Sequence, residues 1–412
     1  MPSLSRFCTR AWLTVALLSV VACLNYLDRV ILTTMRPSVV AAIPMTEAQF
    51  GLLTSVFLWV YALLSPFAGF LADRFSRSKV IIGSLFVWSF VTWLTANATT
   101  FSELLATRAL MGVSEACYIP AALALIADYH RGGTRSLATG IHMVGISVGS
   151  GLGGLGGWLA ERHDWTYAFS LFGTIGIGYS AVLLGGLRDA PRPAAHSADE
   201  APAKPRVRFI PALTNLFERS SFVIALLYWG LLGLTGWAII GWLPTFLGER
   251  FTLTQGNSGF YSTAYLQPAA WIGLLVGGAW ADRWSRKHRR GRIFVTAIGL
   301  CAAAPALLLG SSTHLLWLAL AAFMFNAFAT AFANANMMPI LCLVTDVRYR
   351  ATGYGILNFF ACMVGGITIY LGGALRDAHI HVSVVFVCAA CSLLACAALL
   401  LLIQPDPANA DQ

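Results

Sequence analysis

Four ionisable side chains lie well inside stretches of the sequence that are otherwise apolar. They are Asp28, Arg29, Arg108 and Glu115. A charge at the centre of a lipid bilayer costs roughly 2.5–3.5 kcal/mol on insertion scales, so such residues normally face an internal cavity or one another. Helical rise and spacing place Asp28 and Arg108 in one layer, with Glu115 about two turns deeper on the same helix face as Arg108. We therefore expect the four side chains to meet.

These residue types suit an exchange between a proton and an anion. A carboxyl group loses its charge when it takes up a proton, whereas a guanidinium group stays charged. Asp28 and Glu115 are therefore candidate proton carriers. Arg29 and Arg108 can hold a carboxylate or a phosphate through paired hydrogen bonds. The alternative is a static network of ion pairs that only packs two helices together.

The composition places these residues in a membrane protein. The 412 residues are 58% hydrophobic and 11% charged, and the mean hydropathy is +0.71. A soluble domain carries about 25% charged residues, so the soluble enzymes are excluded. A membrane-spanning helix needs about 20 apolar residues, and the length fits about twelve such helices.

We expect an all-α membrane protein in which two six-helix bundles are related by a pseudo-twofold axis. The predicted helices run over residues 11–36, 48–72, 79–97, 101–128, 136–160, 165–187, 220–247, 256–281, 291–310, 314–345, 351–375 and 382–403. A polar stretch rich in proline and alanine, which cannot form a core, separates the sixth from the seventh. The predicted organisation is an N-terminal bundle at 1–187, a cytoplasmic linker at 188–219 and a C-terminal bundle at 220–412.

The basic residues predict the orientation in the membrane. With both termini and the linker on one side, that side holds 21 of the 27 lysines and arginines. The other side holds four, which are Arg36, Arg162, Arg250 and Arg376. Cytoplasmic loops carry the excess of Lys and Arg, so both termini are expected on the cytoplasmic side. The membrane is expected to be a plasma membrane, namely the inner membrane of a bacterium. The net charge of +9 lies in short clusters between apolar runs, which argues against a nucleic-acid partner.

The sequence repeats itself at a displacement of about half its length. GFLADRFSR at 69–77 matches GAWADRWSR at 278–286, and GGWLAERH at 156–163 echoes GGALRDAH at 372–379. Internal repeats of this kind are typical of secondary transporters, which hold the substrate near the membrane midplane between the two halves.

The first repeat carries a recognisable signature. Gly69-x-x-x-Asp73-Arg74-x-x-Arg77-x-Lys79 resembles the loop between helices 2 and 3 of the major facilitator superfamily, with Ser76 where the family usually has glycine. The resemblance covers nearly the whole chain and implies a cytoplasmic gate. Its residues would be Asp73, Arg74 and Arg77, with Asp282, Arg283 and Arg286 in the second copy. The alternative is that these charges only set the topology.

Two further stretches resemble particular groups within that superfamily. Asn25-Tyr26-Leu27-Asp28-Arg29 is similar to a motif of the anion:cation symporters and to a closely related motif of spinster-like lysolipid transporters. RALMGVSEACY at 108–118 fits both groups. The resemblance to the symporters implies that Tyr61 and Asn358 line the substrate site, and Tyr26 lies close enough to Arg29 along the helix to share the substrate.

These observations predict a transporter and not an enzyme. The first hypothesis is proton-coupled symport of a small organic anion, such as a sugar acid, by a monomer working through alternating access. The alternative is a spinster-like, proton-linked exporter of lysolipid or another amphiphile. A receptor or scaffold that transports nothing would explain neither the buried acids nor the repeats. No cofactor or metal is expected, because Cys388-x-x-Cys391 lies in an apolar run without further ligands.

Overall fold

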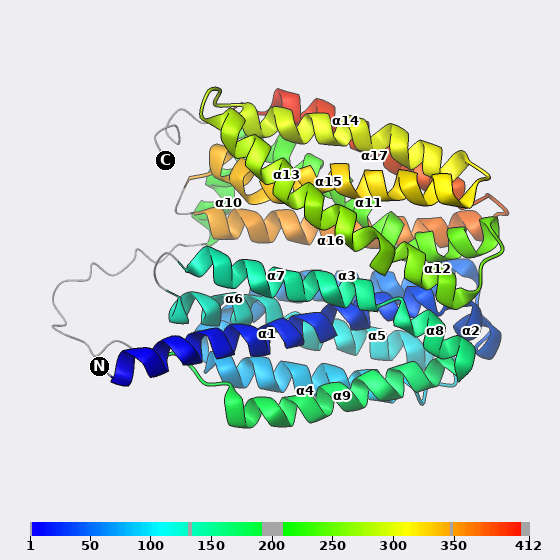
Figure 1. Cartoon of the computed structure of the whole chain (residues 1–412), viewed down its shortest axis with the longest axis horizontal. Helices are drawn as coiled ribbons and strands as arrows, with labels where there is room; N and C mark the ends of the chain where they lie inside the picture. Colours follow the sequence, from blue (N-terminus) through cyan, green and yellow to red (C-terminus); the bar gives the residue numbers. More distant parts are fainter. Residues whose placement is uncertain (1, 131–133, 192–208, 347–348, 405–412) are drawn as a thin grey trace.

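The computed structural model consists of long, roughly parallel helices (Figure 1). It describes residues 2–130, 134–191, 209–346 and 349–404, apart from the side chains at 2–8, 66, 68–73, 136, 209–210, 212 and 351. Eleven helical segments in this part of the chain are long and apolar enough to cross a membrane. α1 begins and α17 ends at the same end of the molecule, called here the terminal end; the other is the far end (Figure 1).

The first half of the chain supplies nine helices to the described structure. They are α1 (Pro2–Thr34), α2 (Arg36–Ala42), α3 (Glu47–Arg74), α4 (Arg77–Thr95), α5 (Phe101–Glu115), α6 (Tyr118–Tyr129), α7 (Arg135–Leu152), α8 (Leu155–Arg162) and α9 (Trp165–Gly186). Local capping starts several of them. The hydroxyl of Thr100 accepts a hydrogen bond from the Glu103 amide, and the Glu103 carboxylate accepts one from the Thr100 amide. This capping box satisfies amides that α5 leaves without partners in its first turn.

The second half supplies eight α-helices and one short 3₁₀ helix. They are α10 (Phe209–Phe217), α11 (Ser220–Arg250), α12 (Gln255–Ser262), η1 (Ala264–Leu266), α13 (Gln267–Ser285), α14 (Gly291–Ser312), α15 (Leu316–Val344), α16 (Arg350–Asp377) and α17 (Ser383–Leu402). α10 lies within the predicted linker, most of which, at 192–208, is outside the described residues. Its sequence FIPALTNLF is apolar enough to pack, and Leu216 is fully buried.

Three predicted spans are interrupted in the structure. The fourth divides between Glu115 and Tyr118, and the fifth divides at Gly153 and Gly154. The predicted eighth span is divided into α12, η1 and α13, and it is not among the eleven long apolar segments. Pro268 lies in the first turn of α13, where the missing amide proton of proline is tolerated. In the interior of one continuous helix, the same proline would remove a hydrogen bond and clash with the preceding turn.

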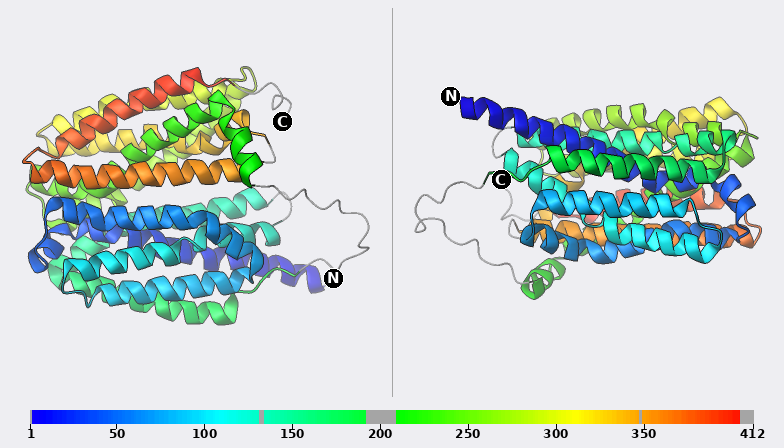
Figure 2. Two further views of the ribbon diagram at one scale, coloured as in Figure 1. Left: turned by 180° about the vertical axis from the view of Figure 1, so that it is seen from behind. Right: turned by 90° about the horizontal axis from the view of Figure 1, so that it is seen from below.

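The two halves meet along two seams. At one, α16 runs beside α3 (Figure 2), and the Ser55 hydroxyl donates to the carbonyl of Gly366 at 2.6 Å. At the other, α7 and α8 pack against α12 and η1, and the Thr263 hydroxyl donates to the carbonyl of Gly151 at 3.0 Å. The site described below lies on the first-half side of these seams.

Glycine allows α7 to approach α1 backbone to backbone. A Cβ atom at Gly145 would collide with the main chain of Ser19, and one at Gly149 would collide with the main chain of Cys23. Small residues at such contacts let transmembrane helices pack closely. The glycine-rich run of the predicted fifth helix thus serves helix packing at these two positions.

Candidate functional site

The four predicted ionisable residues are all buried in the first half. The side chains of Asp28, Arg29, Arg108 and Glu115 are 3%, 4%, 1% and 0% exposed. Asp28 and Arg29 come from α1, and the other two come from α5, which ends at Glu115. The expectation that these groups turn away from lipid agrees with the structure.

Arg29 and Glu115 form a buried ion pair. Nε of Arg29 donates to Oε2 of Glu115 at 2.8 Å. The Nη2 atom of Arg29 and the Oε1 atom of Glu115 are also buried, and neither makes a hydrogen bond to any described residue. The pair therefore keeps one donor and one acceptor for another molecule.

Asp28 and Arg108, which we expected in one layer, lie next to each other, but no ion pair joins their side chains in the described structure. Oδ2 of Asp28 accepts a hydrogen bond from the Thr92 hydroxyl of α4 at 3.3 Å. Arg108 instead donates at 3.4 Å to two main-chain carbonyls, those of Asp28 and of Leu53. Helical rise placed both residues at the right depth, but the rotation of α1 turns the carboxylate toward α4 and leaves its main chain beside Arg108.

Three aromatic rings enclose the guanidinium of Arg29. Its Cζ atom lies 4.8 Å from the ring centre of Tyr26, 4.5 Å from that of Tyr61 and 5.2 Å from that of Phe57. A cation over an aromatic face is stabilised, and more so in a site without water. The predicted positions of Tyr26 and Tyr61 near Arg29 agree with this. Phe57 was not predicted, although it lies one helical turn before Tyr61 and so shares its face.

The second half contributes an apolar wall to this site. Cys362 of α16 belongs to one buried cluster with Tyr61, and Phe359 and Met363 pack against that cluster. Asn358 is half-buried on α16, and no hydrogen bond or ion pair links it to the four charged residues in the described part of the chain. Its predicted contact with substrate remains a prediction.

The structure describes part of the predicted gate at the terminal end, and the gate itself remains a prediction. Arg77 makes an ion pair with Asp128 at the end of α6 and donates to the carbonyl of Ala124 at 3.0 Å. Arg74 is exposed, and the side chain of Asp73 lies outside the described residues.

A second acid holds the start of α4 at this end. The Asp189 carboxylate accepts a hydrogen bond from the Ser78 amide at 2.8 Å. Burial opposes ionisation of Asp189, but hydrogen bonds from Ser76 and Ser78 and the charge of Arg77 outweigh it and lower the pKa of this carboxyl.

In the second copy of the repeat, Asp282 pairs with Arg292 of the next helix. Oδ1 of Asp282 lies 2.9 Å from Nη2 of Arg292. Arg283 and Arg286 are exposed. Among the residues searched, which exclude the undescribed ones, no three His, Cys, Asp or Glu side chains gather closely enough to bind a metal ion.

A family model described as the Major Facilitator Superfamily matches residues 18–319 and 269–412. The human protein spinster homolog 1 is 31% identical over 318 residues, which are 73% of this chain and 60% of that protein. The match thus spans less than two thirds of that relative's length. An MFS-type efflux pump of Mycolicibacterium smegmatis is 25% identical, with 89% of this chain and 85% of the pump covered.

Solved structures share the fold at lower sequence identity. A bacterial homolog to the human lysosomal transporter spinster, crystallised in an inward-facing and unoccupied conformation, superposes with a TM-score of 0.77 at 21% identity. The match covers 96% of this chain and 95% of that one. A nucleoside transporter superposes with a TM-score of 0.73 at 15% identity and covers 95% of this chain and 99% of the other.

Proposed function

The chain belongs to the Major Facilitator Superfamily, and from this premise we propose that it is a secondary transporter which couples protons to the movement of an organic anion. Alternating access would carry the solute past Arg29, with the two halves rocking about the seams. The superfamily and the multi-pass helical fold predicted from the sequence are confirmed. The solute, the coupling and the orientation are our proposals.

The observation that carries the proposal is the incompletely satisfied Arg29–Glu115 pair. The ion pair is buried, and each partner keeps one buried atom without a hydrogen bond among the described residues. A ligand carboxylate or phosphate could accept from Nη2 of Arg29, and a proton on Glu115 would release the guanidinium toward that ligand. Competition between the solute and Glu115 for one arginine would couple the two movements.

Asp28 is a second candidate for the proton. Its Oδ1 atom is buried and makes no hydrogen bond to a described residue, and the Thr92 hydroxyl is the described hydrogen-bond donor to Oδ2. Arg108 holds the main chain at Asp28 and Leu53, so we assign it to positioning the site rather than to gripping the solute.

An amphiphile with an anionic head group is the favoured solute class. The three rings around Arg29 and the apolar wall from α16 would accommodate an apolar portion, while the guanidinium would hold the head. The similarity to spinster homologues supports this reading. A small organic anion such as a sugar acid remains the second candidate, because it would need only the guanidinium and the neighbouring hydroxyl groups.

We further propose that both termini face the cytoplasm, as the excess of basic residues at the terminal end supports. We also propose that the protein is a monomer in a bacterial inner membrane. Its proposed parts are an N-terminal bundle at 1–187, a cytoplasmic linker at 188–219 and a C-terminal bundle at 220–412.

Transport by proteoliposomes under an imposed pH gradient tests the coupling. Solutes are first chosen by thermal shift at two pH values, with lysolipids set against sugar acids. Asp28→Asn and Glu115→Gln are expected to abolish gradient-driven movement, and Arg29→Ala to abolish the thermal shift. Asp164→Asn alters an exposed acid outside the site and serves as the control. Undiminished gradient-driven transport by both acid variants would overturn the coupling assignment.

A further inference from the structure

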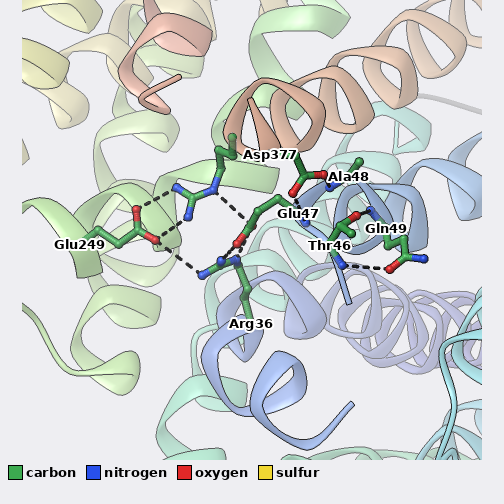
Figure 3. A network of polar contacts seen from close by, with 8 residues as sticks. Arg36, Thr46, Glu47, Ala48, Gln49, Glu249 and Asp377 are labelled. Atoms are coloured by element: carbon green, nitrogen blue, oxygen red, sulfur yellow. Dashed lines mark hydrogen bonds and ion pairs between the residues drawn. The ribbon is translucent and has the colours of Figure 1, made fainter. Parts of the chain in front are cut away.

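Charged residues from both halves meet at the far end of the molecule (Figure 3). Arg36 pairs with Glu47 of its own half and, at 3.6 Å, with Glu249 of the other half. Arg376 pairs with Glu249 at 2.7 Å within its half and with Glu47 at 3.2 Å across the boundary. Each arginine therefore joins one acid from either half, and the four side chains form a closed ring.

A crossed helix cap lies beside this ring. The Asp377 carboxylate, at the end of α16, accepts hydrogen bonds from the amides of Glu47 and Ala48 at 2.8 and 2.9 Å (Figure 3). These amides open α3, which belongs to the other half. A carboxylate at a helix N-terminus satisfies free amides and interacts favourably with the helix dipole.

The same contact occurs in the opposite sense at the second seam. Glu161 of α8 accepts a hydrogen bond from the Gly256 amide at 2.7 Å, and Gly256 lies in the first turn of α12 in the other half. Each half thus supplies an acid that caps a helix of its partner. We call the two contacts the crossed caps.

The internal repeat explains why there are two such caps. Glu161 and Asp377 occupy the same position when GGWLAERH is aligned with GGALRDAH. The helices that they cap also correspond, because Thr46 and Thr254 each accept a hydrogen bond from the amide three residues later, at 3.1 and 3.3 Å. The same cap contact between the halves therefore occurs twice, at positions that the internal repeat relates to each other.

A cavity with polar and apolar lining adjoins these contacts between the halves. It measures about 300 Å³, and Arg36, Glu249 and Thr245 are among its lining residues. Thr245 is 6% exposed, and its hydroxyl makes no hydrogen bond to a described residue. Separation of the halves at the far end would expose the buried Thr245 side chain to solution.

We propose that the crossed caps and the charged ring form the gate that closes this carrier at its far end. Opening there requires Glu161 to leave α12 and Asp377 to leave α3, so that each half loses a cap when the other moves away. The inference rests on the proposed alternating-access function, but the test below reads access to a cavity and does not depend on transport of any solute.

The test measures how fast a cysteine at position 245 reacts with a small, charged thiosulfonate. Thr245→Cys is made in the full chain, and modification of the peptide that contains it is followed by mass spectrometry, which separates it from the native cysteines. Glu161→Ala and Asp377→Ala should each speed the reaction, and together they should speed it at least about 10-fold, since caps contribute about 1 kcal/mol each and 1.4 kcal/mol corresponds to a factor of ten.

Glu103→Ala is the matched control. Glu103 is also an acid that caps a helix. Its carboxylate accepts hydrogen bonds from the amides of Thr99 and Thr100, which belong to the same half. Its removal should lower the melting temperature and leave the reaction at position 245 unchanged. Raising KCl from 50 mM to 1 M with both caps intact should also speed the reaction, because salt weakens the ion pairs that both arginines make with Glu249, whose side chain is 44% exposed.

The salt arm keeps the proposal falsifiable if the double variant fails to fold. Equal reaction rates at low and high salt, or the same rate in the double variant and the parent, would overturn the gate. An acceleration by Glu103→Ala equal to that of the double variant would also overturn it, since it would reflect general loosening. An accelerated reaction in the double variant, together with no detectable transport by the parent, would support the gate and count only against the proposed solutes.

Discussion

Removing Arg29 while keeping Glu115 should destabilise the protein severely. The side chains of the pair are 4% and 0% exposed, and their charged atoms are 2.8 Å apart. Breaking a buried pair by deleting one partner typically costs about 3–5 kcal/mol, because the other charge stays buried and uncompensated. Arg29→Met, which keeps much of the side-chain volume, should lower the free energy of unfolding by about that amount.

The double variant distinguishes an uncompensated charge from lost packing. Arg29→Met combined with Glu115→Leu leaves no buried charge at this position, and replacement of a whole pair by apolar residues is often neutral. We expect the double variant to recover most of the loss, with an interaction energy of up to about 3 kcal/mol in the double-mutant cycle.

The assay is unfolding by sodium dodecyl sulfate in mixed micelles, followed by tryptophan fluorescence. Arg292→Gln serves as the control, because it breaks the ion pair with Asp282, whose side chains are 29% and 64% exposed. Such exposed pairs contribute about 0–1 kcal/mol. An Arg29→Met penalty no larger than that of Arg292→Gln would refute the reasoning, as would a double variant whose loss equals the sum of the single losses.

Three further predictions follow from single contacts. Gly149→Ala should prevent folding or lower the melting temperature by several degrees, because its Cβ atom would collide with the main chain of α1; Gly140→Ala, on the same helix with open space around it, should be neutral or stabilising by up to about 1 kcal/mol. Asp189→Asn should cost about 0.5–1 kcal/mol at neutral pH through the bond to the Ser78 amide. Because the pKa of Asp189 is lowered in the folded protein, this difference should be complete above the ordinary Asp pKa of about 3.9 and vanish as the pH falls through the folded pKa; a constant difference in chemical denaturation from pH 7 to pH 2.5 would contradict it. Tyr61→Leu should lower the affinity for an anionic ligand or the melting temperature more than Tyr61→Phe does, because only the leucine removes the ring over the guanidinium, worth up to about 2 kcal/mol.

The sequence was sufficient to predict that the four charged residues are buried near one another, but not which of them form ion pairs. A charge inside an apolar run is expensive in lipid, so burial of Asp28, Arg29, Arg108 and Glu115 could be predicted from residue types alone. The partner of each group depends on how far neighbouring helices are rotated about their axes. A hydropathy pattern does not contain that angle, so the Arg29–Glu115 pair was missed.

Helix interruptions were also missed, although a signal existed for one of them. Pro268 predicts a boundary near the start of α13, and the unbroken apolar run concealed it. The echo between residues 156–163 and 372–379 was recognised as a repeat, but not as a contact. That an acid in one half reaches the helix start in the other is a property of tertiary structure, which only coordinates reveal.

The crossed caps have a consequence for attempts to divide or recombine this protein. Neither half contains the acid that completes its own helix, since α3 depends on Asp377 and α12 depends on Glu161. Halves produced as separate polypeptides would each present an unfinished helix start, which favours their reassociation. A chimera that joins one half to that of a related carrier should therefore succeed more often when the incoming half brings an acid at the matching position.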